Sequence, residues 1–402
     1  MNPILKSSAI SKLLLMAVIF FYAATSSAQY TTDYASETPI INSNPLPKYS
    51  LDSLDYSMTI GIERTAKGRI WGAWVAGGDN EDAFFVLATS DNQGKIWSSP
   101  RMVIDPHDTK LPEKRRALVG TLWLDPLNRL WLFFDQALTY FDGRAGNWYT
   151  ICENPDADNP TWSAPQRIWH GATLNKPAIL KDGTWALPVS LWDRKKIKSD
   201  LFKTSYQELD SLRGAHLFTS VDSGKTWIRQ GKVTFPSPQF DEHHITELTD
   251  GRLWMTARTA IGMHQSFSSD KGKTWSKPEF YMPHIGSRHV IKRLKSGKLL
   301  LIKHGELNEK TRTRSKMYAY LSDDEGKTWY GKLSIDERRG ISYPDGFEDP
   351  KGNIFISYDR NRDTDGQILM VKFTEKDIVN QKVIDIKDRI VIAQPRGLDK
   401  KQ

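Results

Sequence analysis

The chain has little cysteine, and no flexible segment divides it. Cys152 is the only cysteine among the 402 residues, so no intrachain disulfide bond can form. No stretch rich in Gly and Ser, or in Pro, interrupts residues 29–402. The fold must therefore depend on packing, which the fourteen Trp side chains suit, and we expect residues 29–402 to form a single domain.

Signals for nucleic-acid and metal binding are also missing. No run of basic residues is interleaved with aromatic residues, so we expect no nucleic-acid partner. Five of the nine histidines are candidate metal ligands, but they lack the spacing of a metal site and no acidic cluster accompanies them; they are His170, His243, His244, His289 and His304. We therefore expect neither a metal ion nor another cofactor.

The charge balance is weakly basic. The formal net charge is +8, from 56 Lys and Arg against 48 Asp and Glu. This excess is compatible with acidic substrates such as carboxylated or sulfated glycans, but ordinary solvated Lys and Arg account for it equally well.

The N-terminus has the features of an export signal. Lys6 and Lys12 provide positive charge, residues 13–24 form an apolar run, and residues 25–28 are small. The apolar run is too short to span a bilayer comfortably, and no Cys follows it as a lipid-anchoring site. We expect residues 1–28 to be a cleaved signal peptide, which places the mature protein in the periplasm or outside the cell, with no membrane span.

One eight-residue pattern, S-x-D-x-G-K-T-W, occurs three times. It occupies residues 220–227, 268–275 and 322–329, and residues 90–97 form a fourth copy with Asn92 in place of Asp. Ser and Asp side chains can accept hydrogen bonds from nearby backbone N–H groups, and Gly suits a positive φ. The pattern predicts a hairpin corner, and its recurrence predicts a repeat architecture.

A second repeat gives the number of blades. Six polar turns each open an apolar strand, at residues 68–71, 128–131, 183–185, 251–254, 297–300 and 352–355. Successive turns are 46 to 68 residues apart, which fits one four-stranded propeller blade with its loops. We predict an all-β, six-bladed β-propeller. Residues 29–56 are expected to form an irregular lead-in and residues 382–392 a last strand, with the two chain ends paired in one blade.

These repeats resemble those of the sialidase (neuraminidase) superfamily, in its bacterial branch with BNR repeats, or Asp boxes. The resemblance covers nearly all of residues 29–402. It implies a Tyr nucleophile partnered by a Glu, an Asp general acid, and three Arg that bind the carboxylate of the substrate. The Asp boxes themselves lie at blade corners and also occur in non-enzymes, so the residues near the axis must decide the function.

The nucleophile and its partner have matching positions. The Tyr matches Tyr343, which follows the last Asp box, and the Glu matches Glu242, nine residues before Gly251. The less specific interpretations are that Tyr343 is an ordinary aromatic residue of a strand and that Glu247 competes with Glu242 for the match. Residues 242 and 343 are so far apart in the sequence that only a closed ring brings them together.

The basic residues match in part. One Arg matches Arg258, at the end of an apolar strand, and another matches Arg314, with Arg312 as the neighbouring alternative. The family's first Arg has no counterpart, because residues 56–61 contain no Arg. Arg288 or Arg293 are the candidates to replace it.

Two further positions complete the candidate site. The loop at residues 77–82 contains the candidate general acids, Asp79 and Asp82. Arg116 either lies at the rim of the pocket or belongs to a solvated loop.

Together these residues predict an exported exo-glycosidase that hydrolyses terminal, acidic sugars of a glycan by a retaining Tyr/Glu mechanism. A neutral Tyr nucleophile avoids the repulsion that a carboxylate would meet beside an acidic sugar, and the Glu takes the phenolic proton. The alternatives on the same fold are a glycosidase for another sugar, a polysaccharide lyase, or a glycan-binding propeller without catalysis. The sequence does not indicate an oligomeric state.

Overall fold

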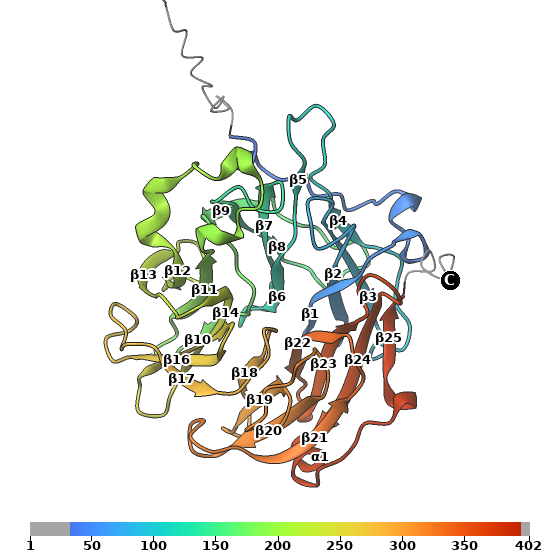
Figure 1. The fold of residues 1–402 in the computed structure, drawn as a ribbon. Coiled ribbons are helices and arrows are strands. Elements are labelled where there is room, and N and C mark those ends of the chain that lie inside the picture. The colour runs from blue at the N-terminus through green and yellow to red at the C-terminus, as the bar shows by residue number, and fades with distance from the viewer. Residues whose placement is uncertain (1–32, 395–402) are drawn as a thin grey trace, which may run out of the picture. The chain divides into compact units, whose positions relative to one another are not determined.

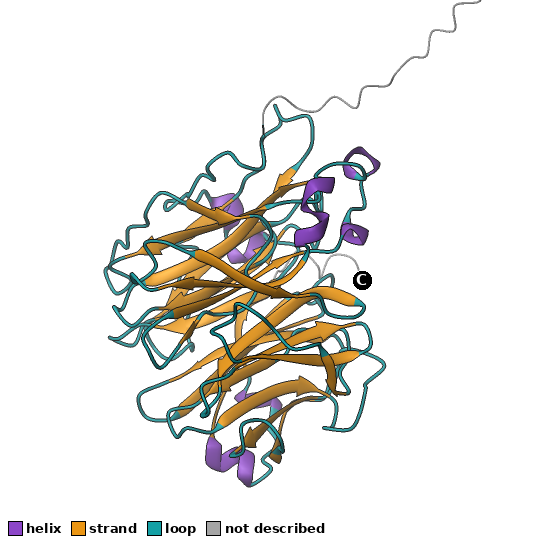
Figure 2. Cartoon of the chain, turned by 90° about the vertical axis from the view of Figure 1, so that its left-hand side faces the viewer, coloured by secondary structure: helices purple, strands orange, loops and turns teal. Residues whose placement is uncertain are grey.

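The strands form six antiparallel sheets arranged around a common centre (Figure 1). The computed structural model describes residues 33–394, so the predicted signal peptide at residues 1–28 lies outside the described residues. The predicted six-bladed β-propeller is confirmed. Strands form most of the regular secondary structure in the described residues, and the helices are short segments at the periphery (Figure 2).

The first three blades contain thirteen strands. Blade 1 consists of β1 (Met58–Arg64), β2 (Ile70–Ala76), β3 (Phe84–Ser90) and β4 (Met102–Ile104). Blade 2 consists of β5 (Arg115–Arg116), β6 (Gly120–Leu124), β7 (Leu130–Leu138), β8 (Gly146–Cys152) and β9 (Gln166–Trp169). Blade 3 consists of β10 (Ala178–Ile179), β11 (Trp185–Leu191), β12 (Gly214–Ser220) and β13 (Ile228–Val233).

The last three blades contain four strands each. Blade 4 consists of β14 (Pro238–Glu247), β15 (Leu253–Thr259), β16 (Gly262–Ser268) and β17 (Glu279–Met282). Blade 5 consists of β18 (Val290–Arg293), β19 (Leu299–His304), β20 (Met317–Ser322) and β21 (Tyr330–Asp336). Blade 6 consists of β22 (Ile341–Glu348), β23 (Asn353–Arg360), β24 (Gln367–Thr374) and β25 (Ile390–Ala393).

The helical segments are short. Two 3-10 turns lie in the lead-in, η1 (Pro47–Tyr49) and η2 (Leu51–Ser53). Three more follow β11: η3 (Arg194–Lys196), η4 (Asp200–Phe202) and η5 (Gln207–Leu212). After β24 come α1 (Glu375–Val379) and η6 (Ile386–Asp388). No helix in residues 33–394 is long and apolar enough to cross a membrane.

The repeated motif forms the corner that its residues predict. In the copy at 220–227, Gly224 N donates to Ser220 Oγ over 2.8 Å, and Thr226 N donates to Asp222 Oδ1 over 2.9 Å. Hydrogen bonds from the Thr226 hydroxyl and backbone lower the pKa of Asp222 to about 2. In the fourth copy, Asn92 Oδ1 accepts from Ile96 N over 2.8 Å, so an amide oxygen replaces the carboxylate.

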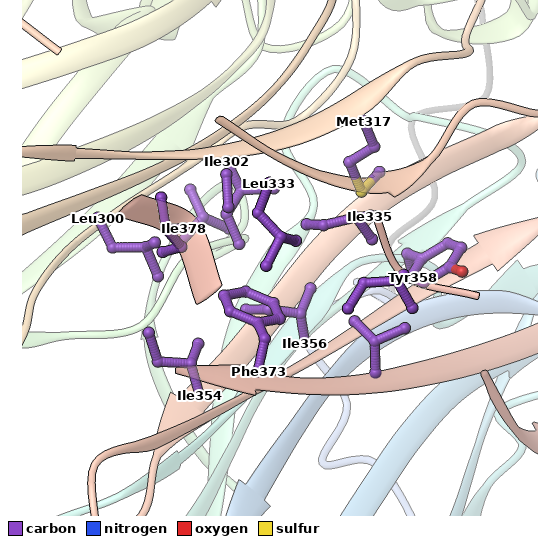
Figure 3. Packing of buried hydrophobic residues seen from close by; sticks show 14 of the residues in the cluster. Leu300, Ile302, Met317, Leu333, Ile335, Ile354, Ile356, Tyr358, Phe373 and Ile378 are labelled. Carbon is purple, nitrogen blue, oxygen red and sulfur yellow. The ribbon is translucent and has the colours of Figure 1, made fainter. Parts of the chain in front are cut away.

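The core lies between neighbouring blades. Between blades 5 and 6, apolar side chains of the two blades pack against each other, and Ile378 of α1 covers one side (Figure 3). Blade 5 contributes Leu300, Ile302, Leu333 and Ile335, and blade 6 contributes Ile354, Ile356 and Phe373. Between blades 2 and 3, the rings of Trp123, Trp131 and Trp185 contact one another, with Trp123 and Trp185 centroids 4.8 Å apart. Packing of this kind stabilises a repeat fold that has no disulfide bond.

The ring closes by contact between blades 6 and 1. The Asp345 carboxylate on β22 accepts from Ile62 N of β1 over 3.0 Å, and the Asp359 carboxylate accepts from Thr59 N over 3.1 Å. The expectation that both chain ends pair in one blade is wrong, because each described sheet consists of consecutive strands. The predicted last strand does exist, as β25, at the C-terminal side of the predicted range.

The two ends of the propeller axis differ in the residues they carry. Tyr343 and Glu242 belong to the first halves of the inner strands β22 and β14. The residues at the far ends of inner strands, including Glu63, Glu247 and Glu348, line one common cavity instead. The two ends of the inner strands therefore carry different chemistry.

Candidate active site

Tyr343 and Glu242 form a buried hydrogen-bonded pair. Tyr343 Oη donates to Glu242 Oε1 over 2.6 Å, although 101 positions separate the two residues in the sequence. Both side chains are buried, with Tyr343 8 % and Glu242 1 % exposed. The closed ring thus provides the convergence that the sequence analysis required. Glu242 Oε2 has no hydrogen-bond partner among the described residues.

The backbone at both residues adopts a rare conformation. Tyr343 has φ of 52°, and Phe240, Asp241 and Glu242 have φ of 65°, 54° and 45°. Positive φ costs a non-glycine residue about 1–3 kcal/mol. The strand register is interrupted at the same places, between Ser342 and Asp345 on β22 and around Asp241 on β14. Such irregularities redirect side chains, and here the phenol and the carboxylate point at each other.

Arg258 extends the pair to a triad. It comes from the end of β15, and its Nη1 donates to Glu242 Oε1 over 2.8 Å and to Tyr343 Oη over 3.4 Å. Arg258 is 5 % exposed, so a carboxylate partner is required to hold its charge in the interior. Burial, with the Glu242 carboxylate next, raises the pKa of Tyr343 to about 12, against the opposing effect of the nearby arginines.

Two more arginines lie over the Tyr343 ring. The guanidinium carbon of Arg362 lies 4.2 Å from the ring centroid, and that of Arg314 lies 5.5 Å from it. Arg314 donates to Ser342 Oγ and to the Gly286 carbonyl, and no carboxylate in the described chain forms an ion pair with it. Arg312, its sequence alternative, is exposed and makes no described contact with this cluster.

Arg362 was missed by the sequence analysis. It follows β23 on blade 6, where Asp359 accepts from its Nε over 2.9 Å and from its Nη2 over 3.0 Å. Ser342 Oγ accepts from the same Nη2 over 2.8 Å. The available signal was the charged segment at residues 359–363, directly after an apolar strand. With Arg258 and Arg314, Arg362 is the third guanidinium group beside Tyr343.

The two candidate acids have different surroundings. Asp79 Oδ2 lies 3.9 Å from Arg362 Nη1, and its side chain is 49 % exposed. Asp82 points elsewhere, since its Oδ1 accepts from Lys114 Nζ over 2.5 Å at the surface. Of the two carboxylates, only Asp79 is near the arginine cluster.

Arg116 and Arg288 are not at the pocket surface. Arg116 is fully buried, forms an ion pair with Asp135, and donates through Nε and Nη2 to the Tyr140 carbonyl. Neither interpretation from the sequence, pocket rim or solvated loop, describes this position. Its guanidinium is used to fix the segment at Tyr140.

Arg288 is 2 % exposed and ties several blades together. It donates to Asn175 Oδ1 over 2.7 Å, to the Ile60 carbonyl over 3.1 Å and to Asp345 Oδ1 over 3.3 Å. All of these acceptors belong to the protein, so we assign Arg288 a structural position instead of the predicted contact with substrate. Arg293, the other candidate replacement, forms an ion pair with Glu325 at 2.6 Å.

An aromatic wall stands beside the arginine cluster. The rings of Tyr140 and Phe240 both contact Trp192, with Phe240 and Trp192 centroids 4.9 Å apart. Lys196 Nζ lies 4.1 Å from the Phe240 ring centroid and Lys198 Nζ lies 3.8 Å from that of Tyr140. This wall is formed by blades 2, 3 and 4, opposite blade 6, and it adds two further cations to the surroundings.

Four histidines, His244, His284, His289 and His304, form ring contacts with one another. His284 contacts both His289 and His304, and His244 contacts His289. Burial lowers the pKa of His289 to about 3 and that of His304 to about 4. Residues 33–394 contain no group of three or more His, Cys, Asp or Glu side chains placed to hold a metal ion.

Solved structures with this fold include sialidases. The chain is similar to the Hadza microbial sialidase Hz136, with a TM-score of 0.62 and 15 % identity over 82 % of this chain and 67 % of that one. It is similar to the intramolecular trans-sialidase from Ruminococcus gnavus in complex with oseltamivir carboxylate, with a TM-score of 0.61 and 13 % identity over 84 % and 98 % of the two chains. It is also similar to a protein of unknown function from Dyadobacter fermentans, with a TM-score of 0.56 and 17 % identity over 77 % and 92 %.

At such identities the likeness concerns the fold alone. A search of curated protein sequences gave no match. Residues 68–356 match the BNR repeat-like domain, which is more than half of the chain. The chain belongs to the BNR repeat-like domain family.

Proposed function

We propose that the protein is an exported exo-glycosidase of sialidase type that releases terminal acidic sugars from glycans with retention of configuration. The observation that carries the proposal is the 2.6 Å hydrogen bond from Tyr343 Oη to Glu242 Oε1, with three guanidinium groups around it. Export is inferred from the pattern of residues 1–28, and the resulting location is the periplasm or the medium.

The pair has the composition of an activated nucleophile. A buried phenol with a pKa of about 12 does not ionise at neutral pH, so it needs a base within hydrogen-bond reach. Glu242 is that base. A Tyr begins the reaction uncharged, and it therefore meets no repulsion from a carboxylate on the adjacent carbon of the sugar.

Two steps complete the reaction. In the first, Tyr343 Oη bonds to the anomeric carbon and gives its proton to Glu242, while Asp79 donates a proton to the leaving oxygen as the glycosidic bond breaks. In the second, Asp79 takes a proton from water, the water oxygen bonds to the anomeric carbon, and Tyr343 leaves and recovers its proton from Glu242. Asp79 is half exposed, which suits an acid that meets a leaving glycan in solvent.

The charges favour an anionic sugar. Glu242 pairs with Arg258 and Asp359 pairs with Arg362, but Arg314 has no carboxylate partner in residues 33–394. Burial lowers the pKa of Arg314, and the neighbouring Arg362 adds to this effect. A substrate carboxylate would relieve this repulsion, and each charge-assisted hydrogen bond that it accepts contributes about 1.5–3 kcal/mol.

The test is the Tyr343→Phe variant, assayed with aryl glycosides of acidic sugars, including N-acetylneuraminate and glucuronate. We expect kcat to fall by at least about 1,000-fold on any substrate that the native protein turns over. Tyr358→Phe is the matched control, because Tyr358 also donates to a buried carboxylate, Asp336, over 2.9 Å, away from this cluster. Unchanged turnover by Tyr343→Phe would remove Tyr343 as the nucleophile.

Elimination is the second candidate. A lyase also pairs a Tyr with an Arg that neutralises a uronate, and Arg258 Nη1 lies 3.4 Å from Tyr343 Oη. Product analysis distinguishes the reactions, because elimination from a uronate leaves an unsaturated sugar that absorbs in the near ultraviolet. A glycan-binding propeller without catalysis would retain acidic glycans and release no sugar.

A further inference from the structure

A cavity of about 700 Å³ lies at the far ends of the inner strands. Strand β22 contributes to both regions, because Tyr343 belongs to the candidate active site, whereas Phe347 and Glu348 line the cavity. Along β22 the cavity begins at Asp345, two positions beyond Tyr343, and neither Tyr343 nor Glu242 lines it, so the cavity is distinct from the pair of Tyr343 and Glu242. Its volume falls within the range of small-molecule sites, about 300–1,000 Å³.

Most cations that line this cavity already have partners. Lys176 Nζ donates to Glu63 Oε1 over 2.8 Å and lies 3.2 Å from Asp345 Oδ2. Arg293 pairs with Glu325 at 2.6 Å, and Lys295 Nζ donates to the Asp349 carbonyl over 3.0 Å. Lys181 Nζ likewise donates to two backbone carbonyls. These groups form the wall of the cavity and have little capacity left for a ligand.

Lys292 is the exception. It lies on β18 and lines the cavity, yet its ammonium has no hydrogen bond or ion pair with any residue in the described range. Burial lowers its pKa, while the Glu63 carboxylate acts in the opposite direction. A partly buried ammonium without a partner loses hydration and gains no hydrogen bond, so an anion bound beside it would stabilise it.

The rest of the wall restricts the ligand. Trp123, Phe347 and Ile291 provide apolar surface, which suits an aromatic ring or the face of a sugar ring. Glu63, Asp345 and Glu348 also line the cavity and repel any anion in proportion to its charge, although Lys176 pairs with Glu63 and Asp345 and offsets part of this repulsion. A dianionic phosphate therefore fits less well than a single carboxylate.

The geometry points to a second ligand site in this cavity, where Lys292 binds the carboxylate of a small, ring-sized organic acid. The site is independent of the glycosidase reaction, since no residue of the Tyr343 cluster lines the cavity. Experiments can therefore test this site and the proposed function independently.

The test uses the intact protein with its lysines labelled by reductive ¹³C-dimethylation, which retains their positive charge. The Lys292→Arg variant identifies the Lys292 signal by its absence from the spectrum. Benzoate and glucuronate are then titrated, with benzyl alcohol and glucose as uncharged counterparts. We expect a carboxylate to shift the Lys292 signal to saturation, with at least about tenfold higher affinity than its counterpart, the factor of one charge-assisted hydrogen bond.

Lys298→Arg is the matched control substitution on the same hairpin. Lys298 Nζ lies 3.2 Å from Glu375 Oε2, outside the cavity, so this variant must retain the full shift of the Lys292 signal. A Lys292 signal that neither carboxylate moves, or one that moves equally with the uncharged counterparts, would overturn the proposal. Both results are independent of any loss of activity at Tyr343.

Discussion

Replacement of Arg362 by Met tests whether blade 6 supplies a cation that binds the substrate. Met replaces the aliphatic part of the side chain with one of similar shape, but it removes the guanidinium that lies 4.2 Å from the Tyr343 ring. The loss of one charge-assisted hydrogen bond to the substrate, about 1.5–3 kcal/mol, corresponds to a fall in kcat/KM of about 10- to 150-fold.

The same change leaves Asp359 without its ion pair. Its side chain is fully buried and retains two donors, Ser342 Oγ at 2.7 Å and Thr59 N at 3.1 Å. Removal of one partner from a buried ion pair typically costs about 3–5 kcal/mol, and the two remaining donors place the expected loss at the lower end. The double variant with Asp359→Asn removes the orphaned charge, so it should recover stability but not activity.

The assay compares kcat/KM for an aryl glycoside of a carboxylated sugar with that for its methyl ester. Arg362→Met should lower the value for the acid selectively, because the ester presents no charge to the missing guanidinium. Arg338→Met is the control, since Arg338 also pairs with a buried carboxylate, Asp336, at 2.6 Å on the outer strand β21. An equal loss on acid and ester would refute the assignment of Arg362 to the substrate carboxylate.

Three further predictions concern acid catalysis, the blade corners and pH. Asp79→Asn should lower kcat/KM about 100-fold for alkyl glycosides, because their leaving group needs a proton, but it should change the value little for aryl glycosides. Asp82→Asn is the control and should change neither value. Steady-state kinetics with both substrates checks this prediction. Gly224→Ala should destabilise the fold more than Gly251→Ala, as measured by denaturant unfolding. Both glycines have a positive φ, 83° and 87°, but only at Gly224 would an added Cβ clash with a neighbour, the Trp131 ring at 2.5 Å. Burial raises the pKa of Asp241 to about 6 from 3.8, so the stability that it contributes is complete below about pH 4 and is lost as pH rises through 6. In the native protein the free energy of unfolding should therefore fall by about 3 kcal/mol between about pH 4 and pH 6, and this fall should be absent in Asp241→Asn. Denaturant unfolding at each pH measures both.

The fold was predictable because its signals are local. Each blade corner is held by bonds within eight residues, such as Gly224 N to Ser220 Oγ, so the motif predicts the corner without any knowledge of the rest. Ring closure is different, because it depends on contacts such as Ile62 N to Asp345 Oδ2, which join residues 283 positions apart. No local pattern distinguishes closure by packing from closure by strand exchange, and that prediction was wrong.

The candidate site was predictable only where a motif surrounds the residue. Tyr343, Glu242 and Arg258 lie at recognisable distances from blade turns, and the structure brings their side chains into contact. Arg116 and Arg288 show the limit of this reasoning. An Arg among apolar residues indicates a buried anionic partner, but the sequence does not tell whether that anion is a substrate or a protein carboxylate such as Asp135.

The position of Arg362 depends on the seam between blades 1 and 6. At Gly61, an added Cβ would lie 2.4 Å from Asp345 Oδ2, so β1 lies close against β22 at the ring closure. Asp359 accepts from Thr59 N of β1 and also holds the Arg362 guanidinium, so one buried carboxylate both joins blades 1 and 6 and orients the cation. The position of that cation is therefore set by the seam between the two blades. A substitution at Asp359 should consequently weaken ring closure and substrate binding together, whereas one at Arg314, which has no such link to β1, should affect binding far more than stability.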